Sequence, residues 1–195
     1  MFTGKKIGIG FTGSHHTHAS IFKEVKRIVD QGADVYPFIT DAVKYTDTVH
    51  GKAKDKIEEI ERITGKRVVS TILEAEPFGP KIPLDCMVVA PLTGNSLSKM
   101  ATAQTDNAVL MASKATLRNG NPVVIGISTN DALGLNGVNL MKLFTAKNIF
   151  FVPFGQDDPF NKPNSLIADW TFLADTIDHA LQRKQIQPVL ISYHK

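Results

Sequence analysis

The feature that most constrains the fold is an apolar segment that ends abruptly in a turn of small polar residues. Residues 86–90 read Cys-Met-Val-Val-Ala, and Pro-Leu-Thr-Gly-Asn-Ser follows before a helical pattern rich in Ala and Leu. A short continuous apolar run bounded by turn residues is typical of a strand that is buried on both faces. Such a turn delivers backbone N–H groups and short polar side chains to the carboxyl edge of a parallel sheet. Open α/β sheets bind their ligands at that edge.

Strand, turn and helix patterns alternate along the rest of the chain. Further strands are expected at residues 6–12, 34–39, 68–73, 121–127 and 149–152. A helix is expected after the turn at residues 13–14, with its apolar positions at Ile21, Val25, Ile28 and Val29. Further helices are expected at 52–63, 97–103, 107–117, 133–146 and 165–181, with a loop at 154–164. This alternation predicts an α/β fold with three layers, in which helices cover both faces of a doubly wound parallel sheet. We expect a single domain over residues 1–195, with residues 186–195 as an edge strand or an oligomer arm.

Composition excludes several classes of protein. The 195 residues are 43% apolar and 21% charged, which suits a folded domain with a substantial core. The 22 basic and 19 acidic residues are spread along the chain and leave a net charge of +3, so no basic stripe predicts binding to nucleic acid or a membrane surface. The N-terminal sequence does not resemble a signal peptide, and no apolar run approaches the roughly 20 residues of a membrane span. We expect a cytoplasmic protein that acts on a small molecule.

The first strand leads into a glycine turn that is suited to anion binding. Gly13 and Ser14 lie between this strand and a helix, where free backbone N–H groups and the helix dipole favour a phosphate. The spacing Gly8-x-Gly10-x-x-Gly13 formally matches a dinucleotide fingerprint, but the first two glycines fall inside the strand. The acidic residue of such a fingerprint belongs about 20 positions further on, and Asp41 comes too late. NAD is therefore the weaker interpretation.

Three histidines follow this turn at the start of the helix: His15, His16 and His18. Imidazoles can ligate a metal, contact a phosphate or dicarboxylate, or move a proton. Adjacent helical residues point to different faces, so the three rings do not readily converge on one ion, and we expect no metal site. Contact of His15 or His16 with a substrate and packing against solvent or an interface both stay open.

Three other polar residues and the cysteine also have two interpretations each. Thr40, at the end of the second strand, either faces a ligand or caps the next helix. Asn136 and Asn139 either reach the ligand from a later helix or are surface positions. Cys86 lies inside a predicted strand, so a core thiol is a better interpretation than a nucleophile.

Taken together, the polar strand ends resemble those of the flavoprotein family that holds the flavin-containing cysteine decarboxylases and the flavin prenyltransferases. The most specific match is APLTGNSLSKMA at residues 90–101, which fits the family pattern A-P-x-[ST]-x-N-[ST]-x-[AS]-K-x-A and is followed by Asp106-Asn107. The resemblance covers residues 6–160 in order. It implies a Rossmann-type fold of the cysteine decarboxylase kind and FMN as the cofactor.

The resemblance also implies roles for individual residues. Gly13 and Ser14 match the turn that holds the flavin phosphate, which the Thr40 hydroxyl also approaches. Thr93, Asn95 and Ser96 match the central turn that faces the ribityl chain and the edge of the isoalloxazine ring. The remaining residues that the pattern assigns to the cofactor are Pro91, Ser128 and Thr129. For substrate contact, the candidates are His15, His16 and Asn136.

Three further stretches resemble one branch of the family from spore-forming bacteria: GIGFTGSHHTH, ILEAEPFGPKIPLD and FFVPFGQDDPFNKPNSL. This branch implies an oxidoreductase subunit that helps convert a dihydro- or tetrahydropyridine dicarboxylate to the aromatic pyridine dicarboxylate during sporulation. It further implies a partner subunit that binds NAD(P), a cytoplasmic location in the mother cell, and a homo-oligomer, either a trimer or a dodecamer.

Two other functions stay open. One is a flavin-binding decarboxylase or prenyltransferase-like enzyme, and the other is a non-catalytic assembly subunit for an NAD(P)-dependent partner. Cysteine decarboxylation is not expected, because no histidine lies between His50 and His179 and the single cysteine is inside a strand. Thr129 stands where the prenyltransferases carry an arginine, which weakens the prenyltransferase alternative.

Overall fold

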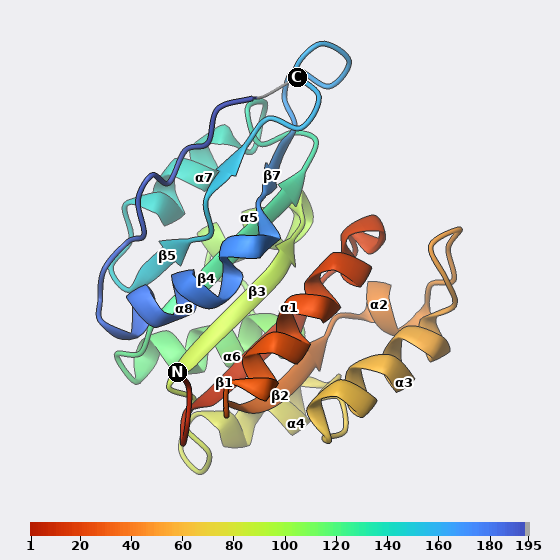
Figure 1. The fold of residues 1–195 in the computed structure, drawn as a ribbon, viewed down its shortest axis with the longest axis vertical. Helices are drawn as coiled ribbons and strands as arrows, with labels where there is room; N and C mark the ends of the chain where they lie inside the picture. Colours follow the sequence, from red (N-terminus) through yellow and green to blue (C-terminus); the bar gives the residue numbers. More distant parts are fainter. Residues whose placement is uncertain (194–195) are drawn as a thin grey trace.

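The computed structural model describes residues 1–193, which form one seven-stranded sheet with helices on both faces (Figure 1). The parallel part of the sheet has the strand order β2-β1-β3-β4-β5. Its members are β1 (Lys6–Phe11), β2 (Asp34–Ile39), β3 (Cys86–Leu92), β4 (Val123–Thr129) and β5 (Ile149–Phe151). This is the flavodoxin-like order of doubly wound sheets, and it confirms the predicted fold class.

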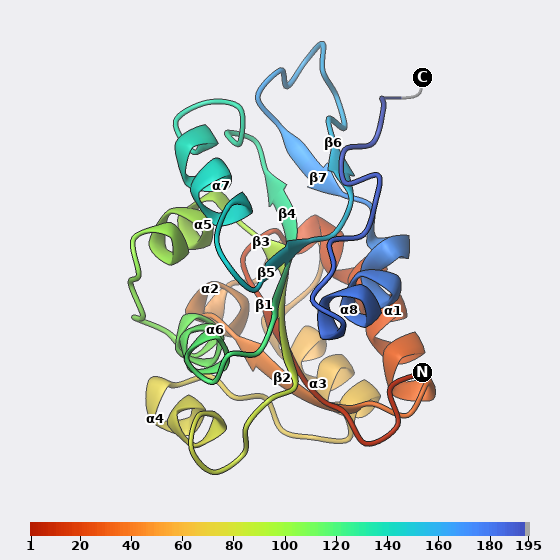
Figure 2. The ribbon, with the colours of Figure 1, turned by 90° about the vertical axis from the view of Figure 1, so that its left-hand side faces the viewer.

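Helices form a layer on each side of the sheet (Figure 2). One layer contains α1 (His18–Asp30), α3 (Ala53–Thr64) and α8 (Leu173–Leu181). The other contains α4 (Ile72–Ala75), α5 (Gly94–Ala101), α6 (Ala108–Arg118) and α7 (Gly137–Phe144). Shorter pieces complete the chain: η1 (His15–Thr17), α2 (Asp41–Tyr45), η2 (Glu76–Phe78) and η3 (Trp170–Phe172). No helix in the described part of the chain is long and apolar enough to cross a bilayer.

The first strand packs closely against its neighbours because it carries two glycines. A Cβ at Gly8 would lie 2.6 Å from Leu84 Cδ1, and one at Gly10 would lie 2.6 Å from Val109 Cγ1. Gly10 therefore lets α6 pack closely on the sheet, and Gly8 leaves room for Leu84 from the loop that precedes β3, so both glycines serve packing in the strand interior, away from the turn. Cys86 begins β3 and is fully buried, as the core-thiol interpretation predicts.

An antiparallel extension that the sequence did not predict continues the sheet past the end of β4. The strand β7 (Leu166–Ala168) pairs antiparallel with Ser128 and Thr129, and β6 (Phe154–Gly155) pairs with β7. The last described residues run beside β6: Phe154 donates its N–H to the Val189 carbonyl at 3.0 Å. Positions 194–195 of the predicted arm lie outside the described residues.

Four predicted element boundaries were wrong. Residues 68–73 do not form a strand: Val69 makes one isolated bridge with Phe38, and the chain then turns into α4. Residues 154–155 of the predicted loop belong to β6. The helix expected at 165–181 is β7, then η3, and becomes α-helical only at Leu173. The helix expected at 133–146 begins at Gly137, because the preceding residues form a turn around Asp131.

Candidate functional site

The candidate site lies at the carboxyl ends of β1, β3 and β4. Strands β1 and β3 are neighbours, and the helices that follow them, α1 and α5, lie on opposite faces of the sheet. The sheet is therefore open between these two strand ends, which is the switch point where doubly wound folds bind ligands. Two adjoining hollows of about 350 and 400 Å³ are found here, and Gly13 and Thr93 line both.

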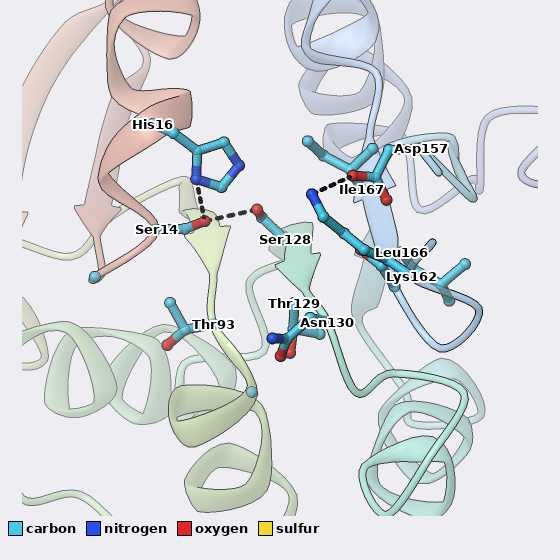
Figure 3. A pocket seen from close by; sticks show the side chains of 13 residues that line it. Ser14, His16, Thr93, Ser128, Thr129, Asn130, Asp157, Lys162, Leu166 and Ile167 are labelled. Carbon is cyan, nitrogen blue, oxygen red and sulfur yellow. Dashed lines mark hydrogen bonds and ion pairs between the residues drawn. The ribbon is translucent and has the colours of Figure 1, made fainter. Parts of the chain in front are cut away.

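The first hollow lies between the end of β4, the start of η1 and the loop that joins β6 to β7 (Figure 3). Two residues of its lining, Ser14 and Ser128, form a hydrogen bond with their Oγ atoms 2.7 Å apart. His16 Nδ1 is 3.5 Å from Ser14 Oγ. The Lys162 ammonium, on the far wall, is 3.9 Å from an Asp157 carboxylate oxygen. This hollow thus combines hydroxyl groups, an imidazole and one loosely paired cation.

The second hollow lies between the ends of β2 and β3 and the start of α6. Besides Gly13 and Thr93, its lining includes three more of the predicted cofactor residues, Thr40, Asn95 and Ser96. The lysine in this lining, Lys99, is 2.5 Å from an Asp106 carboxylate oxygen, and this neighbour lowers the pKa of Asp106. Donors to a ligand here are therefore mainly neutral hydroxyl, amide and backbone groups.

A buried hydrogen-bond pair fixes β1 to β3 beneath both hollows. Thr12 Oγ1 donates to the Pro91 carbonyl at 2.6 Å and accepts the Thr93 N–H at 3.1 Å. Thr93 in turn caps α5, since its Oγ1 accepts the Ser96 N–H at 3.5 Å. Pro91 lines neither hollow, so its part in this site is to accept the Thr12 hydroxyl through its carbonyl group.

The Asp131 carboxylate organises the edge of the first hollow, and sequence reasoning missed it. It accepts hydrogen bonds from Thr129 Oγ1 at 2.5 Å and from Asn136 Nδ2 at 2.7 Å. A Cβ on Gly94 would lie 2.7 Å from Asp131 Oδ1, so only glycine fits at the start of α5 without displacing this carboxylate. Asn136 lines neither hollow, while Thr129 lines the first one.

The histidines next to the first turn separate into different environments. His18 is buried, its Nε2 is 2.8 Å from the Thr12 carbonyl oxygen, and burial lowers its pKa to about 4. His16 points to the first hollow, as Figure 3 shows. His15 turns away from both hollows, and its Nδ1 lies 3.0 Å from the ammonium of Lys56.

The structure thus brings most of the predicted site residues together, although in two groups. Gly13 and Thr93 stand between the groups; Ser14, Ser128 and Thr129 belong to the first hollow, and Thr40, Asn95 and Ser96 to the second. Sequence reasoning also missed Lys162, Asp157 and Lys56. The first two come from a loop that reaches the site only because β7 pairs with β4.

Comparison with known proteins places this geometry in a family. Residues 1–177 match the family model described as Flavoprotein, and the chain belongs to the flavoprotein family. It is 56% identical over 192 residues to the dipicolinate synthase subunit designated B of Bacillus subtilis (strain 168), covering 98% of this chain and 96% of that protein. The resemblance inferred from the first and central turns is confirmed, as is the closer resemblance to the spore-former branch.

Solved structures agree with this assignment. A crystal structure of the same dipicolinate synthase subunit from Bacillus halodurans C matches with a TM-score of 0.92 and 56% identity, covering 99% of both chains. The FMN-dependent cysteine decarboxylase SpaF matches with a TM-score of 0.65 and 17% identity, over 91% of this chain and 98% of that chain. At that identity, the similarity to SpaF shows a common fold alone.

Proposed function

We propose that this chain is the flavin-binding subunit of a dipicolinate synthase. In this proposal it acts with the other subunit of the synthase, which binds NAD(P), to convert a dihydro- or tetrahydropyridine dicarboxylate to dipicolinate in the mother-cell cytoplasm of a sporulating bacterium. The observation that carries the proposal is the 56% identity to the Bacillus subtilis dipicolinate synthase subunit, which extends over 98% of this chain.

The residues at the sheet edge suit FMN. In this proposal the FMN phosphate would bind in the second hollow near Gly13 and Thr40, which both line it. Asn95 and Ser96, at the start of α5, offer hydrogen bonds to the hydroxyl groups of a ribityl chain. These donors are mostly uncharged, as expected for a site that recognises a polyol as well as a phosphate.

When bound, FMN would supply an acceptor for the hydride that leaves the reduced pyridine ring. The residues of this chain would bind and orient the reactants. The hydrogen bonds among Thr12, Pro91 and Thr93 hold the ends of β1 and β3 at a fixed separation. The first hollow lies next to the proposed flavin site, and its hydroxyl groups and Lys162 can bind a carboxylate of the substrate.

Cys86 takes no part in this chemistry. It is fully buried, and burial raises the pKa of its thiol. A decarboxylation that needs a reactive thiolate is therefore disfavoured. The alternative to a flavin enzyme is a non-catalytic assembly subunit that binds no flavin, in which case the NAD(P) of the partner subunit accepts the hydride.

Reconstitution with the NAD(P)-binding subunit tests the proposal. Dipicolinate formation, followed by terbium luminescence, should require both subunits and should fall when FMN is removed from this chain by dialysis against denaturant and refolding. Restored activity on adding FMN would support a flavin-using subunit. Equal activity with and without FMN would support the assembly alternative, and activity of the NAD(P)-binding subunit alone would contradict both.

A further inference from the structure

A buried lysine with neutral hydrogen-bond partners lies beside the first turn. Lys56, on α3, is 6% exposed, and its ammonium donates to His15 Nδ1 at 3.0 Å and to Thr48 Oγ1 at 3.2 Å. No carboxylate forms an ion pair with it among residues 1–193. A buried ammonium normally has a carboxylate partner, because burying an unpaired charge is costly.

The nearby acidic residue is already used for another purpose. Burial lowers the pKa of Lys56 overall, and Asp47 opposes this shift without cancelling it. Asp47 Oδ1 accepts the N–H of Ala53, the first residue of α3, at 2.8 Å. The Lys56 ammonium is therefore a buried cation that has no carboxylate in an ion pair with it among the described residues.

A cluster of histidines lies beside this cation. Four of the six histidines in the chain gather here, three from residues 15–18 and His50 from the turn that precedes α3. The ring centroids of His16 and His50 are 6.1 Å apart, and those of His15 and His18 are 5.1 Å apart. Burial lowers the pKa of His15, and Lys56 and His50 lower it further.

The tautomer of His15 follows from its neighbour. Because Lys56 donates to Nδ1, that nitrogen is unprotonated and the proton of neutral His15 is on Nε2. His15 Nε2–H and the exposed ring of His50 can therefore donate to a ligand, while Lys56 supplies the positive charge. A set of N–H donors around a buried ammonium is the arrangement that binds an oxyanion.

His16 connects this cluster to the first hollow. Its ring is 6.1 Å from His50 on one side, and it lines the hollow that contains Ser128 and Lys162 on the other. Burial lowers the pKa of His16 most; His50 and Lys162 lower it further, while Asp157 raises it. A molecule with two separated anionic groups can thus contact the hollow with one group and the cluster with the other.

We propose that His15, His16, His50 and Lys56 form a binding site for one carboxylate of a small dicarboxylate. The identity of the dicarboxylate rests on the proposed function, while the site itself rests on the buried lysine and its imidazole neighbours. The same oxyanion chemistry would also suit the phosphate of FMN, so the experiment has to separate these two sources.

The bound carboxylate would favour protonation of the imidazoles beside it other than His15, whose Nδ1 stays unprotonated because it accepts from Lys56. The charged or titratable groups that face the cluster come from three segments of the chain: His15, His16, His18, Asp47, His50, Lys56, Asp157 and Lys162. In the free protein, burial and neighbouring positive groups hold the pKa values of His15, His16 and His18 low, and a bound anion opposes this effect. Binding should therefore take up protons and should be tighter near pH 6 than near pH 8, on the order of tenfold.

Calorimetric titration with pyridine-2,6-dicarboxylate, in the presence of FMN, tests the site. Lys56→Met should weaken binding at least about tenfold, because a hydrogen-bonded charge is lost. His50→Gln, a substitution on the exposed turn, should reduce both the affinity and the proton uptake. The matched control is Lys54→Met: it removes the same charge two residues away, from a side chain that is 81% exposed and paired with Glu58, and it should leave binding unchanged.

Each outcome of the titration decides one question. Equal effects of Lys56→Met and Lys54→Met would overturn the site and leave the proposed function standing. Absence of binding by the wild-type chain would also overturn it. If Lys56→Met weakens FMN but not riboflavin and leaves the dicarboxylate unaffected, the anion is the flavin phosphate and the carboxylate assignment is wrong. If dicarboxylate binding depends on Lys56 but the protein yields no dipicolinate with the NAD(P)-binding subunit, the proposed site is supported and the proposed function is wrong.

Discussion

Substitution of Gly94 by alanine should destabilise the protein through a contact that can be identified in advance. The new Cβ would lie 2.7 Å from Asp131 Oδ1 and 2.8 Å from Thr129 Oγ1, both closer than side chains normally approach. The carboxylate cannot move freely, because Thr129 Oγ1 and Asn136 Nδ2 donate to it at 2.5 and 2.7 Å. Relief of the contact must weaken at least one of these hydrogen bonds.

The size of the effect follows from these opposing contributions. A weakened hydrogen bond to a charged group costs about 2 kcal/mol, while replacing glycine by alanine in a helix returns up to about 1 kcal/mol. The expected net loss in the free energy of unfolding is about 1 to 2 kcal/mol. With a slope of about 2 kcal/mol per molar urea, the unfolding midpoint should fall by about 0.5 to 1 M.

A double-mutant cycle separates this contact from a general effect of alanine. In an Asp131→Ala background the carboxylate is absent, so Gly94→Ala should cost much less than in the wild-type chain. Urea unfolding followed by circular dichroism measures all four proteins. An unchanged midpoint for Gly94→Ala, or an equal cost in both backgrounds, would refute the reasoning.

Three further predictions concern buried groups. The pKa of His18 is lowered to about 4 in the folded protein, against about 6.5 in the unfolded chain. The free energy of unfolding should therefore fall by about 3 kcal/mol as the pH decreases from about 6.5 to 4. In urea unfolding, the His18→Gln variant should lose less stability over the same pH range. Thr12→Val leaves the Thr93 N–H without its acceptor and should cost about 1 to 3 kcal/mol in the same assay; a cost under a few tenths would contradict this role. Cys86 should react with iodoacetamide only on unfolding, and rapid labelling of the native protein, detected by mass spectrometry, would show that the thiol is accessible.

The parallel core was predictable because its strands are buried on both faces. Residues 86–90 form a continuous apolar run, and residues 123–127 form another that is interrupted only by Gly126; such runs have few alternatives when glycine and polar turns bound them. The short helix α4 was missed although its signal was present. Thr71 and Glu74 form a capping box, in which Thr71 Oγ1 accepts the Glu74 N–H at 3.2 Å.

Other features depend on contacts between distant parts of the chain. The apolar positions Leu166, Trp170 and Leu173 face inward as predicted, yet they do so from a strand, a 3-10 turn and a helix in succession. Lys56 and His15 are 41 residues apart in sequence, and neither local pattern indicates the other. Such pairings follow from the packing of α3 against α1, which periodicity does not specify.

Surface properties were also only partly predictable. The helix predicted at residues 107–117 is α6, and its apolar side chains are buried largely against the sheet. Four exposed apolar side chains lie around the start of α7, namely Leu133, Leu135, Val138 and Met141. The predicted homo-oligomer stays a prediction.

The most direct test of the account is whether the purified chain retains flavin at the ends of β1 and β3. After incubation with FMN and gel filtration, flavin absorption should co-elute with the wild-type protein. It should be strongly reduced for Asn95→Ala, whose side chain lines the second hollow, and unchanged for Asn161→Ala, an exposed residue of the β6–β7 loop. A wild-type protein that elutes colourless would contradict the account, and equal retention by both variants would place the flavin elsewhere.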